Sequence, residues 1–156
     1  MTKRITLERT YTATLHELWE MWTTKEGIES WWGPDGFRVE VTQLDLRVGG
    51  ITEYLMIADS PAMEKAMREM GMPLRSPCRL RYTEITPHVR LVYLHATDFI
   101  PGVPAYDVTH AIEFHAAGDE VRMVLSFDPM HDDAWTQRAT AGWTMELGKL
   151  GEALKR

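Results

Sequence analysis

A long amphipathic helix near the end of the sequence sets a requirement that the rest of the fold must meet. The pattern predicts a helix from about Asp132 to Leu154, with Asp132 or Asp133 as its N-cap. Its apolar face consists of residues at helical spacing: Trp135, Ala139, Trp143, Leu147, Leu150 and Leu154. A face of this length has to be buried, so the preceding segments must offer a broad apolar surface.

Seven preceding segments alternate between apolar and polar residues, the pattern of β-strands with one buried face. They cover residues 4–14, 37–42, 51–56, 78–86, 90–97, 108–116 and 121–127. Turn signals separate several of them, including Gly49-Gly50, Pro87-His88 and Ala117-Gly118. Because short connections favour antiparallel neighbours, the sequence predicts an α+β fold in which a curved antiparallel sheet wraps around the long C-terminal helix.

Two short helices are predicted between the first and second strands. Thr14 is a candidate N-cap, and Glu17 three residues later completes a capping-box pattern. Lys25-Glu26-Gly27 interrupts the helical spacing, and a second short helix runs to Trp31-Trp32 before a turn at residues 33–36. The first strand is therefore followed by helices and not by a hairpin.

The segment after the third strand predicts a further helix. Ser60 suits its N-cap, Pro61 its first position and Gly71 its end. Three methionines at i, i+4 and i+7 form one stripe: Met63, Met67 and Met70. The stripe fits a helix that packs on the body of the protein; it also fits a mobile lid, or a contact between two copies in a homodimer.

Charge and cysteine content bear on the class of function. The formal net charge of −6 argues against a nucleic-acid partner, since phosphate binding draws on a basic surface. Cys78 is the only cysteine, which excludes an internal disulfide and disfavours a thiolate zinc site. No apolar run approaches the ~20 residues of a membrane span, and residues 1–4 carry no signal-peptide pattern. We therefore expect one cytoplasmic domain over residues 1–156 that binds neither nucleic acid nor membrane.

Three strings in the sequence resemble one known superfamily. They are residues 31–34 (WWGP), residues 45–50 (DLRVGG), and Gly142-Trp143 followed at helical spacing by Leu147, Leu150 and Leu154. In this order and spacing, over essentially the whole length, the chain resembles the START-like (SRPBCC) superfamily. The branch it resembles is that of the C-terminal domain of the heat-shock-protein-90 ATPase activator. The resemblance implies the helix-grip fold, with an apolar cavity between the sheet and the last helix.

The resemblance also implies a range of functions. Members of this branch look like binders of apolar ligands, and a few relatives are cyclases or dehydratases. No obligatory catalytic residue carries over to a position of this sequence. The activator has a separate N-terminal domain without a counterpart here, so a full co-chaperone role is not implied.

The residues expected to line the cavity follow from strand parity, because alternate side chains of a strand share a face. The candidate ligand-binding residues are Trp32, Tyr54, Tyr82, Tyr93, His95, His110, Ile112, Met123, Leu125 and Trp143. Three ionisable side chains share this apolar face: Glu84, His95 and His110. An unpaired polar group there costs roughly 1–3 kcal/mol, so these three need partners.

A hairpin between the fifth and sixth strands, turning near residues 102–103, would pair His95 with His110. The preceding turn sets Tyr82 beside Tyr93. Two imidazoles so close would not both carry charge. A neutral ring that donates to a ligand oxygen favours ligands with a carbonyl, phenol or carboxylate on an apolar body; alternatively, tyrosine hydroxyls or water satisfy both rings.

Other chemistry finds less support. His110 and His115 are five residues apart on one strand, so they point to opposite faces and cannot chelate together. His131 stands among aspartates at the start of the last helix, where capping already explains acidic residues. No Gly-x-Ser-x-Gly elbow or glycine-rich phosphate loop occurs. We therefore predict no metal and no cofactor.

The leading interpretation is a protein that binds a small apolar or aromatic molecule in this cavity. Two alternatives stay open: an enzyme of the cyclase or dehydratase type, in which Glu84, His95 and His110 transfer protons, and a protein-interaction module related to co-chaperones. An elongated cavity with converging polar groups favours binding or catalysis. A filled interior with a large exposed apolar patch favours an interaction module.

Overall fold

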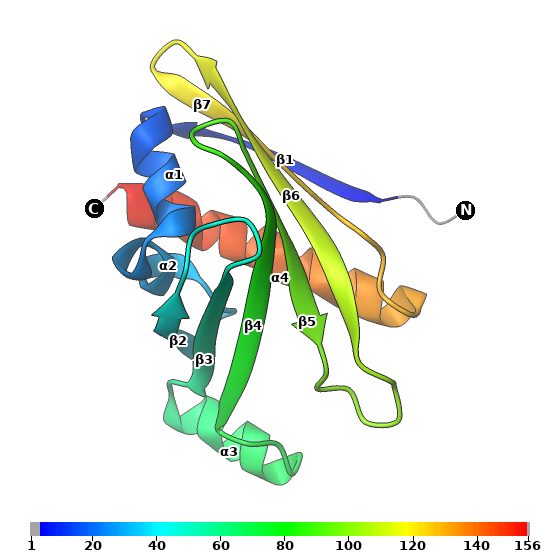
Figure 1. Ribbon diagram of the computed structural model, residues 1–156. Coiled ribbons are helices and arrows are strands. Elements are labelled where there is room, and N and C mark those ends of the chain that lie inside the picture. The colour runs from blue at the N-terminus through cyan, green and yellow to red at the C-terminus, as the bar shows by residue number, and fades with distance from the viewer. Residues whose placement is uncertain (1–3, 156) are drawn as a thin grey trace.

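Seven antiparallel strands form one curved sheet, and the last helix lies across its concave side (Figure 1). The computed structural model describes residues 4–155, so residues 1–3, where the sequence shows no signal-peptide pattern, lie outside the described range. The elements follow in this order: β1 (Ile5–Thr12), α1 (Leu15–Thr23), α2 (Lys25–Trp31), β2 (Phe37–Leu44), β3 (Ile51–Ala58), α3 (Pro61–Glu69), β4 (Arg75–Thr86), β5 (Arg90–Thr97), β6 (Tyr106–Ala117), β7 (Glu120–Phe127) and α4 (Asp133–Leu154). This is the α+β helix-grip architecture that the sequence predicts.

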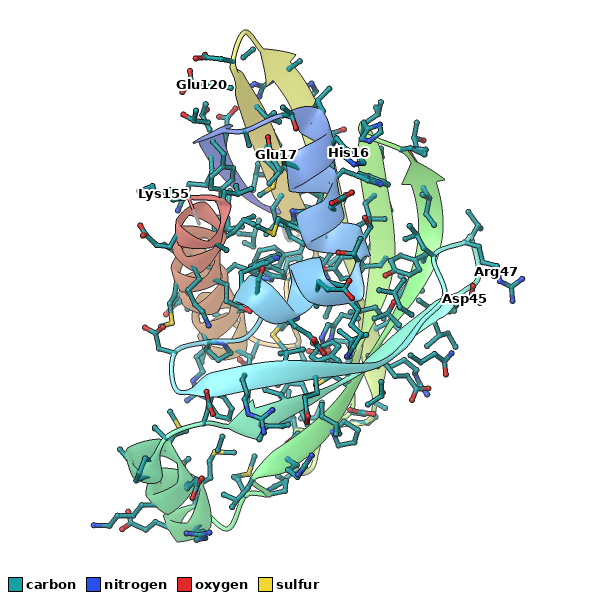
Figure 2. The ribbon with its side chains drawn as sticks, turned by 90° about the vertical axis from the view of Figure 1, so that its left-hand side faces the viewer. His16, Glu17, Asp45, Arg47, Glu120 and Lys155 are labelled. Carbon is teal, nitrogen blue, oxygen red and sulfur yellow. The ribbon has the colours of Figure 1, made fainter. Side chains whose placement is uncertain are left out.

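The strand order in the sheet is β1-β7-β6-β5-β4-β3-β2. Strands β2 to β7 pair with their neighbours along the chain, as short connections favour. β1 pairs with β7 instead, because α1 and α2 stand between β1 and β2. In Figure 2, α1 and α2 lie beside α4 on one side of the sheet, and contacts join the three helices. Together these helices bury one face of the sheet.

Side-chain caps fix the starts of the helices. Thr14 Oγ1 accepts from the Glu17 N–H at 3.0 Å, and the Glu17 carboxylate accepts from the Thr14 N–H at 3.1 Å. This is the predicted capping box. Ser60 caps α3, with Pro61 in its first turn, and Asp132 caps α4. All of these caps confirm the predictions from the sequence.

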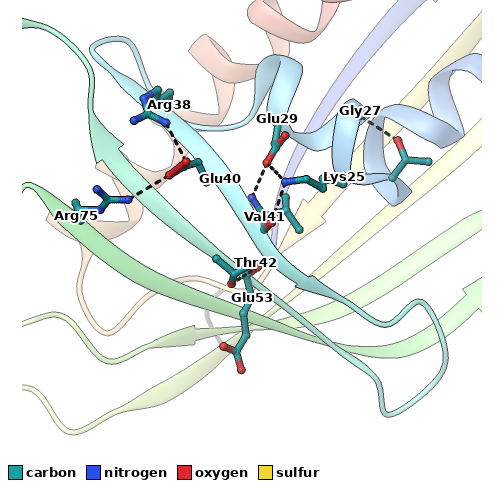
Figure 3. Close-up of polar contacts among 10 residues, drawn as sticks. Lys25, Gly27, Glu29, Arg38, Glu40, Val41, Thr42, Glu53 and Arg75 are labelled. Atoms are coloured by element: carbon teal, nitrogen blue, oxygen red, sulfur yellow. Dashed lines mark hydrogen bonds and ion pairs between the residues drawn. The ribbon is translucent and has the colours of Figure 1, made fainter.

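A carboxylate ties α2 to the edge strand β2 (Figure 3). Glu29 accepts from the Val41 N–H at 2.8 Å and from Lys25 Nζ at 2.6 Å. Lys25 also donates to the Val41 carbonyl at 3.1 Å, so one ion pair satisfies both backbone groups of Val41 at the open edge. Burial opposes ionisation, but the hydrogen bonds from Lys25 and Val41 hold the pKa of Glu29 below its ordinary value.

The core lies between α4 and the sheet. Trp143, Leu147 and Leu150 are 8%, 1% and 0% exposed, as the apolar face of the predicted helix requires. Four indoles form what we call the tryptophan cluster: Trp22, Trp31, Trp32 and Trp143. Their ring centroids lie between 4.8 and 6.4 Å apart. The cluster anchors α4 to the two short helices.

The methionine stripe of α3 is only partly in contact with the protein. Met67 is buried, Met63 lies half-buried over Gly36, and Met70 is 64% exposed. α3 projects beyond the ends of β3 and β4 (Figure 1) and contributes no described residue to the cavity lining. Met63 and Met67 therefore pack on the body of the protein, which is one of the roles that the sequence allows for the stripe.

The register of the β5–β6 hairpin differs from the predicted register by two residues, so this prediction is wrong. His95 faces Val108 and not His110. The hairpin turn centres on Pro101-Gly102 and not on residues 102–103. Because the shift is an even number of residues, both histidines stay on the concave face.

A β-bulge on β4 removes Glu84 from the concave face. Tyr82 faces Tyr93 as predicted, but Glu84 already faces Val92, so Thr83 is an extra residue in the ladder. The Glu84 side chain is 48% exposed and forms an ion pair with Arg90 at 3.1 Å. The prediction that Glu84 shares the face of the two histidines is therefore wrong.

Candidate ligand-binding site

A cavity of ≈ 220 Å³ lies between the middle of α4 and strands β3, β5, β6 and β7. Most of its wall is apolar or aromatic, and a few polar side chains reach it from the sheet and from the helix. The lining consists of Trp32, Tyr54, Met56, His95, Thr97, Phe99, Val108, His110, Phe127, Met130, Ala139, Gly142, Trp143 and Glu146. The cavity has the position that the helix-grip fold implies.

The structure brings half of the predicted residues to the cavity wall. Those that line it are Trp32, Tyr54, His95, His110 and Trp143. The others are buried on the same side of the sheet without bordering the cavity: Tyr82, Tyr93, Ile112, Met123 and Leu125. Strand parity places the strand residues of both groups on one face, but the tryptophan cluster fills one end of it, where the rings of Trp32 and Tyr93 lie 6.3 Å apart.

Tyr54 and His95 form a hydrogen-bonded pair at the cavity wall. The Tyr54 hydroxyl lies 3.0 Å from His95 Nε2, and His95 Nδ1 lies 3.0 Å from the Ala96 carbonyl oxygen. A carbonyl can only accept, so Nδ1 carries the proton and Nε2 accepts from Tyr54. Burial lowers the pKa of His95 and raises the pKa of Tyr54 well above its ordinary value. Both side chains are therefore neutral at neutral pH.

His110 is 6% exposed and is held in the same way. Its Nδ1 lies 3.1 Å from the Val108 carbonyl oxygen, so Nδ1 donates and Nε2 is an acceptor. Within the described chain, no hydrogen bond forms at Nε2. The ring stacks on Tyr93 and Phe127, with centroids 5.0 and 5.5 Å away. Burial, reinforced by neighbouring His95, lowers the pKa of His110 to about 3.

The two imidazole rings are neighbours although they do not face each other in the ladder. The ring centroids of His95 and His110 are 6.0 Å apart. Both rings donate their only N–H to backbone carbonyls. Neither ring therefore has a donor left for a ligand oxygen, which removes the basis for the predicted preference for carbonyl and carboxylate ligands.

Among the described residues of the cavity wall, Glu146 on α4 is the one carboxyl, and the sequence reasoning missed it. Its Oε1 accepts from the Gly33 N–H at 2.8 Å, and Lys149 donates to the Gly33 carbonyl at 2.6 Å. Gly33 has a φ of 99°, a conformation that glycine adopts readily and other residues rarely do. Burial raises the pKa of Glu146 to about 7, against the opposing effects of the Gly33 hydrogen bond and the Lys149 charge.

A sequence signal for Glu146 exists. It follows Trp143 by three residues and precedes Leu147, so it shares the apolar face of the predicted helix. An ionisable residue on such a face needs a buried partner, and this marks it as a candidate. Phe99 and Met130 had no such signal, because they lie in connections where no periodicity assigns a face.

The remaining candidates for other chemistry have ordinary contacts. His131 Nδ1 lies 2.8 Å from the Tyr106 hydroxyl. Within residues 4–155, no group of three or more His, Cys, Asp or Glu side chains is arranged to hold a metal ion. In the same range, every helix is too short or too polar to cross a membrane.

The curved antiparallel sheet, the long helix across it and the lined cavity between them define a START-like protein of the helix-grip class. Within that class, the chain belongs to the family of Activator of Hsp90 ATPase homolog 1-like proteins, whose family model matches residues 12–155. The family identity agrees with the resemblance seen in the sequence strings. No curated protein matches the chain closely enough to be counted as a relative.

Solved structures share this fold at low sequence identity. A protein from Chromobacterium violaceum is 19% identical and superposes with a TM-score of 0.78 over 99% of both chains. The AHSA1 protein from Silicibacter pomeroyi is 20% identical, with a TM-score of 0.74 over 98% of both chains. An AHSA1-like protein from Aeromonas hydrophila is 18% identical, with a TM-score of 0.71 over 98% of this chain and 92% of its own. At these identities the likeness concerns the fold.

Proposed function

We propose that this protein binds a small, largely apolar or aromatic molecule in the cavity between α4 and the sheet. One observation carries the proposal: fixed polar groups converge on an aromatic cavity. These groups are the Tyr54–His95 pair, Nε2 of His110 and the carboxyl of Glu146. A few well-placed polar groups on an apolar wall are typical of ligand sites.

The cavity volume limits the size of this ligand. At ≈ 220 Å³ it is smaller than the ~300–1,000 Å³ of sites for drug-sized molecules. The proposed ligand therefore has a single ring or a short chain.

Native mass spectrometry of the protein purified from its own host tests this proposal. We expect a bound small molecule on the wild type. Ala139 lines the cavity, whereas Ala141 is exposed on the same helix. Ala139→Phe should fill the cavity and abolish the adduct, and Ala141→Phe should retain it. An adduct that survives in Ala139→Phe, or a wild type without any adduct, would count against the proposal.

A second candidate function, proton-transfer catalysis, is favoured by the pKa of Glu146. A carboxyl with a pKa of about 7 can both accept and give a proton at neutral pH. The histidines are less suited, because burial lowers the pKa of both. The test is to incubate the co-purified molecule with wild type and Glu146→Gln. Chemical conversion by the wild type alone supports catalysis, and recovery of unaltered molecule from both supports binding.

The family name raises a third candidate, contact with a chaperone. For such a role we would expect one broad exposed apolar patch. The exposed large apolar side chains of the described chain are instead spread over five separate segments: Leu46 and Val48, Met70 and Met72, Val89, Phe99, and Met145. No segment of the described chain presents more than two of these side chains, so no single element stands out as a docking face.

A further inference from the structure

The charge of the cavity wall depends on a single side chain. Among the described lining residues, Glu146 is the one acid, and none is Lys or Arg. Burial lowers the pKa of His95 and of His110, so both rings are neutral and each carries its single proton on Nδ1. The wall can consequently offer a negative charge to a ligand but no positive one.

One oxygen of the Glu146 carboxyl is free to bind a ligand. Oε1 is occupied by the Gly33 N–H, at 2.8 Å, and no hydrogen bond forms at Oε2 within the described chain. Oε2 lies over Gly142, since a methyl group on the Gly142 α-carbon would stand 4.0 Å from it. Gly142 also lines the cavity, so the free oxygen and the open space are on the same side of α4.

Three aromatic rings line the same cavity as this carboxyl. The Trp32 ring centroid lies 5.5 Å from that of Trp143 and 6.1 Å from that of Tyr54, and all three rings line the cavity. Aromatic faces attract cations and give no comparable help to anions. His110 Nε2 and the Tyr54 oxygen, whose proton goes to His95, add two acceptors.

We propose that the ligand carries a protonated amine on a compact aromatic or aliphatic body, and that Oε2 of Glu146 accepts a hydrogen bond from its ammonium group. This inference rests on the proposed function of the cavity. The aromatic wall takes the apolar body and the cation together, and ionised Glu146 disfavours carboxylate ligands because they would face its charge without a positive partner.

Binding of an amine is therefore coupled to the ionisation of Glu146. The titratable groups around it are Lys149 on its own helix, Tyr54 on β3, Tyr93 and His95 on β5, and His110 on β6. Burial keeps the last four neutral. Amine affinity should rise as the pH increases through about 7, because the carboxylate form of Glu146 is then fully populated.

Calorimetric titration with three probes of similar shape tests the inference: phenethylamine, phenylpropanoate and propylbenzene. Phenethylamine should bind at least roughly tenfold more tightly than propylbenzene, and phenylpropanoate should bind most weakly. Glu146→Gln keeps an oxygen for the Gly33 N–H and should weaken phenethylamine by roughly tenfold or more while leaving propylbenzene unchanged. The matched control is Glu152→Gln, which removes one charge from an exposed site of the same helix and should change neither affinity.

The outcomes distinguish a failure of this inference from a failure of the proposed function. If phenylpropanoate binds as tightly as phenethylamine, or if Glu146→Gln leaves the amine affinity unchanged, the amine inference is overturned and the cavity still binds ligands. If none of the three probes binds the wild type, the proposed function is overturned together with the inference.

Discussion

The Tyr54 hydroxyl donates to Nε2 of His95 across 3.0 Å, from β3 to β5. These strands are not neighbours, because β4 lies between them. The bond therefore spans the concave face and is independent of the sheet ladder. Since His95 is also held by the Ala96 carbonyl, the pair gives the cavity a fixed polar edge.

Tyr54→Phe should remove this edge while keeping the ring. Nε2 of His95 then loses its donor, and we expect the free energy of unfolding to fall by ~1–2 kcal/mol in urea denaturation. Nitrogen chemical shifts of the His95 imidazole should show a smaller population of the Nδ1–H tautomer. Unchanged stability together with an unchanged tautomer would contradict this account of the pair.

Two buried tyrosines offer a matched comparison. The Tyr93 hydroxyl is buried without a hydrogen-bond partner in the described chain, whereas the Tyr82 hydroxyl lies 2.7 Å from Thr52 Oγ1. Tyr93→Phe should leave stability unchanged or raise it by ~1–2 kcal/mol, and Tyr82→Phe should lower it by ~1 kcal/mol. Equal losses in thermal or urea unfolding would mean that a bound water or ligand satisfies Tyr93.

His110→Phe should make the protein less sensitive to acid. The folded pKa of about 3 lies below the ordinary 6.5, so the unfolded chain takes up a proton between these values and the folded chain does not. Wild-type stability from this group is present above pH ~6.5 and is lost as the pH falls, by ~1.4 kcal/mol per unit. Urea unfolding at pH 7 and pH 5 should show a smaller loss in the variant. An equal loss of stability in wild type and variant would show that His110 is not buried in its neutral form.

Glu146→Gln should remove a pH dependence of the opposite sign, which the wild type has. The folded pKa of about 7 lies above the ordinary 4.5, so the stability contributed by the protonated carboxyl is present below pH ~4.5 and is lost as the pH rises through 7. From pH 5 to pH 8 the wild type should lose up to ~3 kcal/mol relative to the variant. Glu152→Gln is the control. If the difference in unfolding free energy between wild type and variant does not change with pH, the Glu146 carboxyl is exposed to solvent.

The grip of α4 on the sheet predicts a large difference between the buried and the exposed face of this helix. Leu147 is 1% exposed, and Leu147→Ala should cost ~2–5 kcal/mol of unfolding free energy. Met145 is 41% exposed on the same helix, and Met145→Ala should change stability by less than ~0.5 kcal/mol. Similar costs in the two variants would be inconsistent with the helix-grip packing.

Much of the fold was predictable because it depends on local chemistry. The capping box at Thr14 and the Ser60 cap are short patterns whose hydrogen bonds form within four residues. The buried face of α4 follows from helical spacing, so Trp143 and Leu147 were placed correctly. These features do not require knowledge of distant segments.

The details of the site were less predictable because they depend on distant packing and on single-residue irregularities. The bulge at Thr83 reverses the face of Glu84, and no sequence pattern marks it. Parity puts Tyr93 and His95 on one face, but only the packing of the indoles decides that His95 borders the cavity and Tyr93 does not. The Glu146 carboxyl is held by the N–H of Gly33, which is far away in the sequence.

The tryptophan cluster has an optical consequence. Indoles whose centres are 4.8–6.4 Å apart pass excitation energy among themselves faster than they emit, so the cluster behaves as one emitter. Trp32 and Trp143 border the cavity, whereas Trp22 and Trp31 are buried behind them. A bound molecule that quenches either cavity indole therefore also drains the other members of the cluster. Binding should quench most of the tryptophan fluorescence although the molecule touches only two of the six tryptophans.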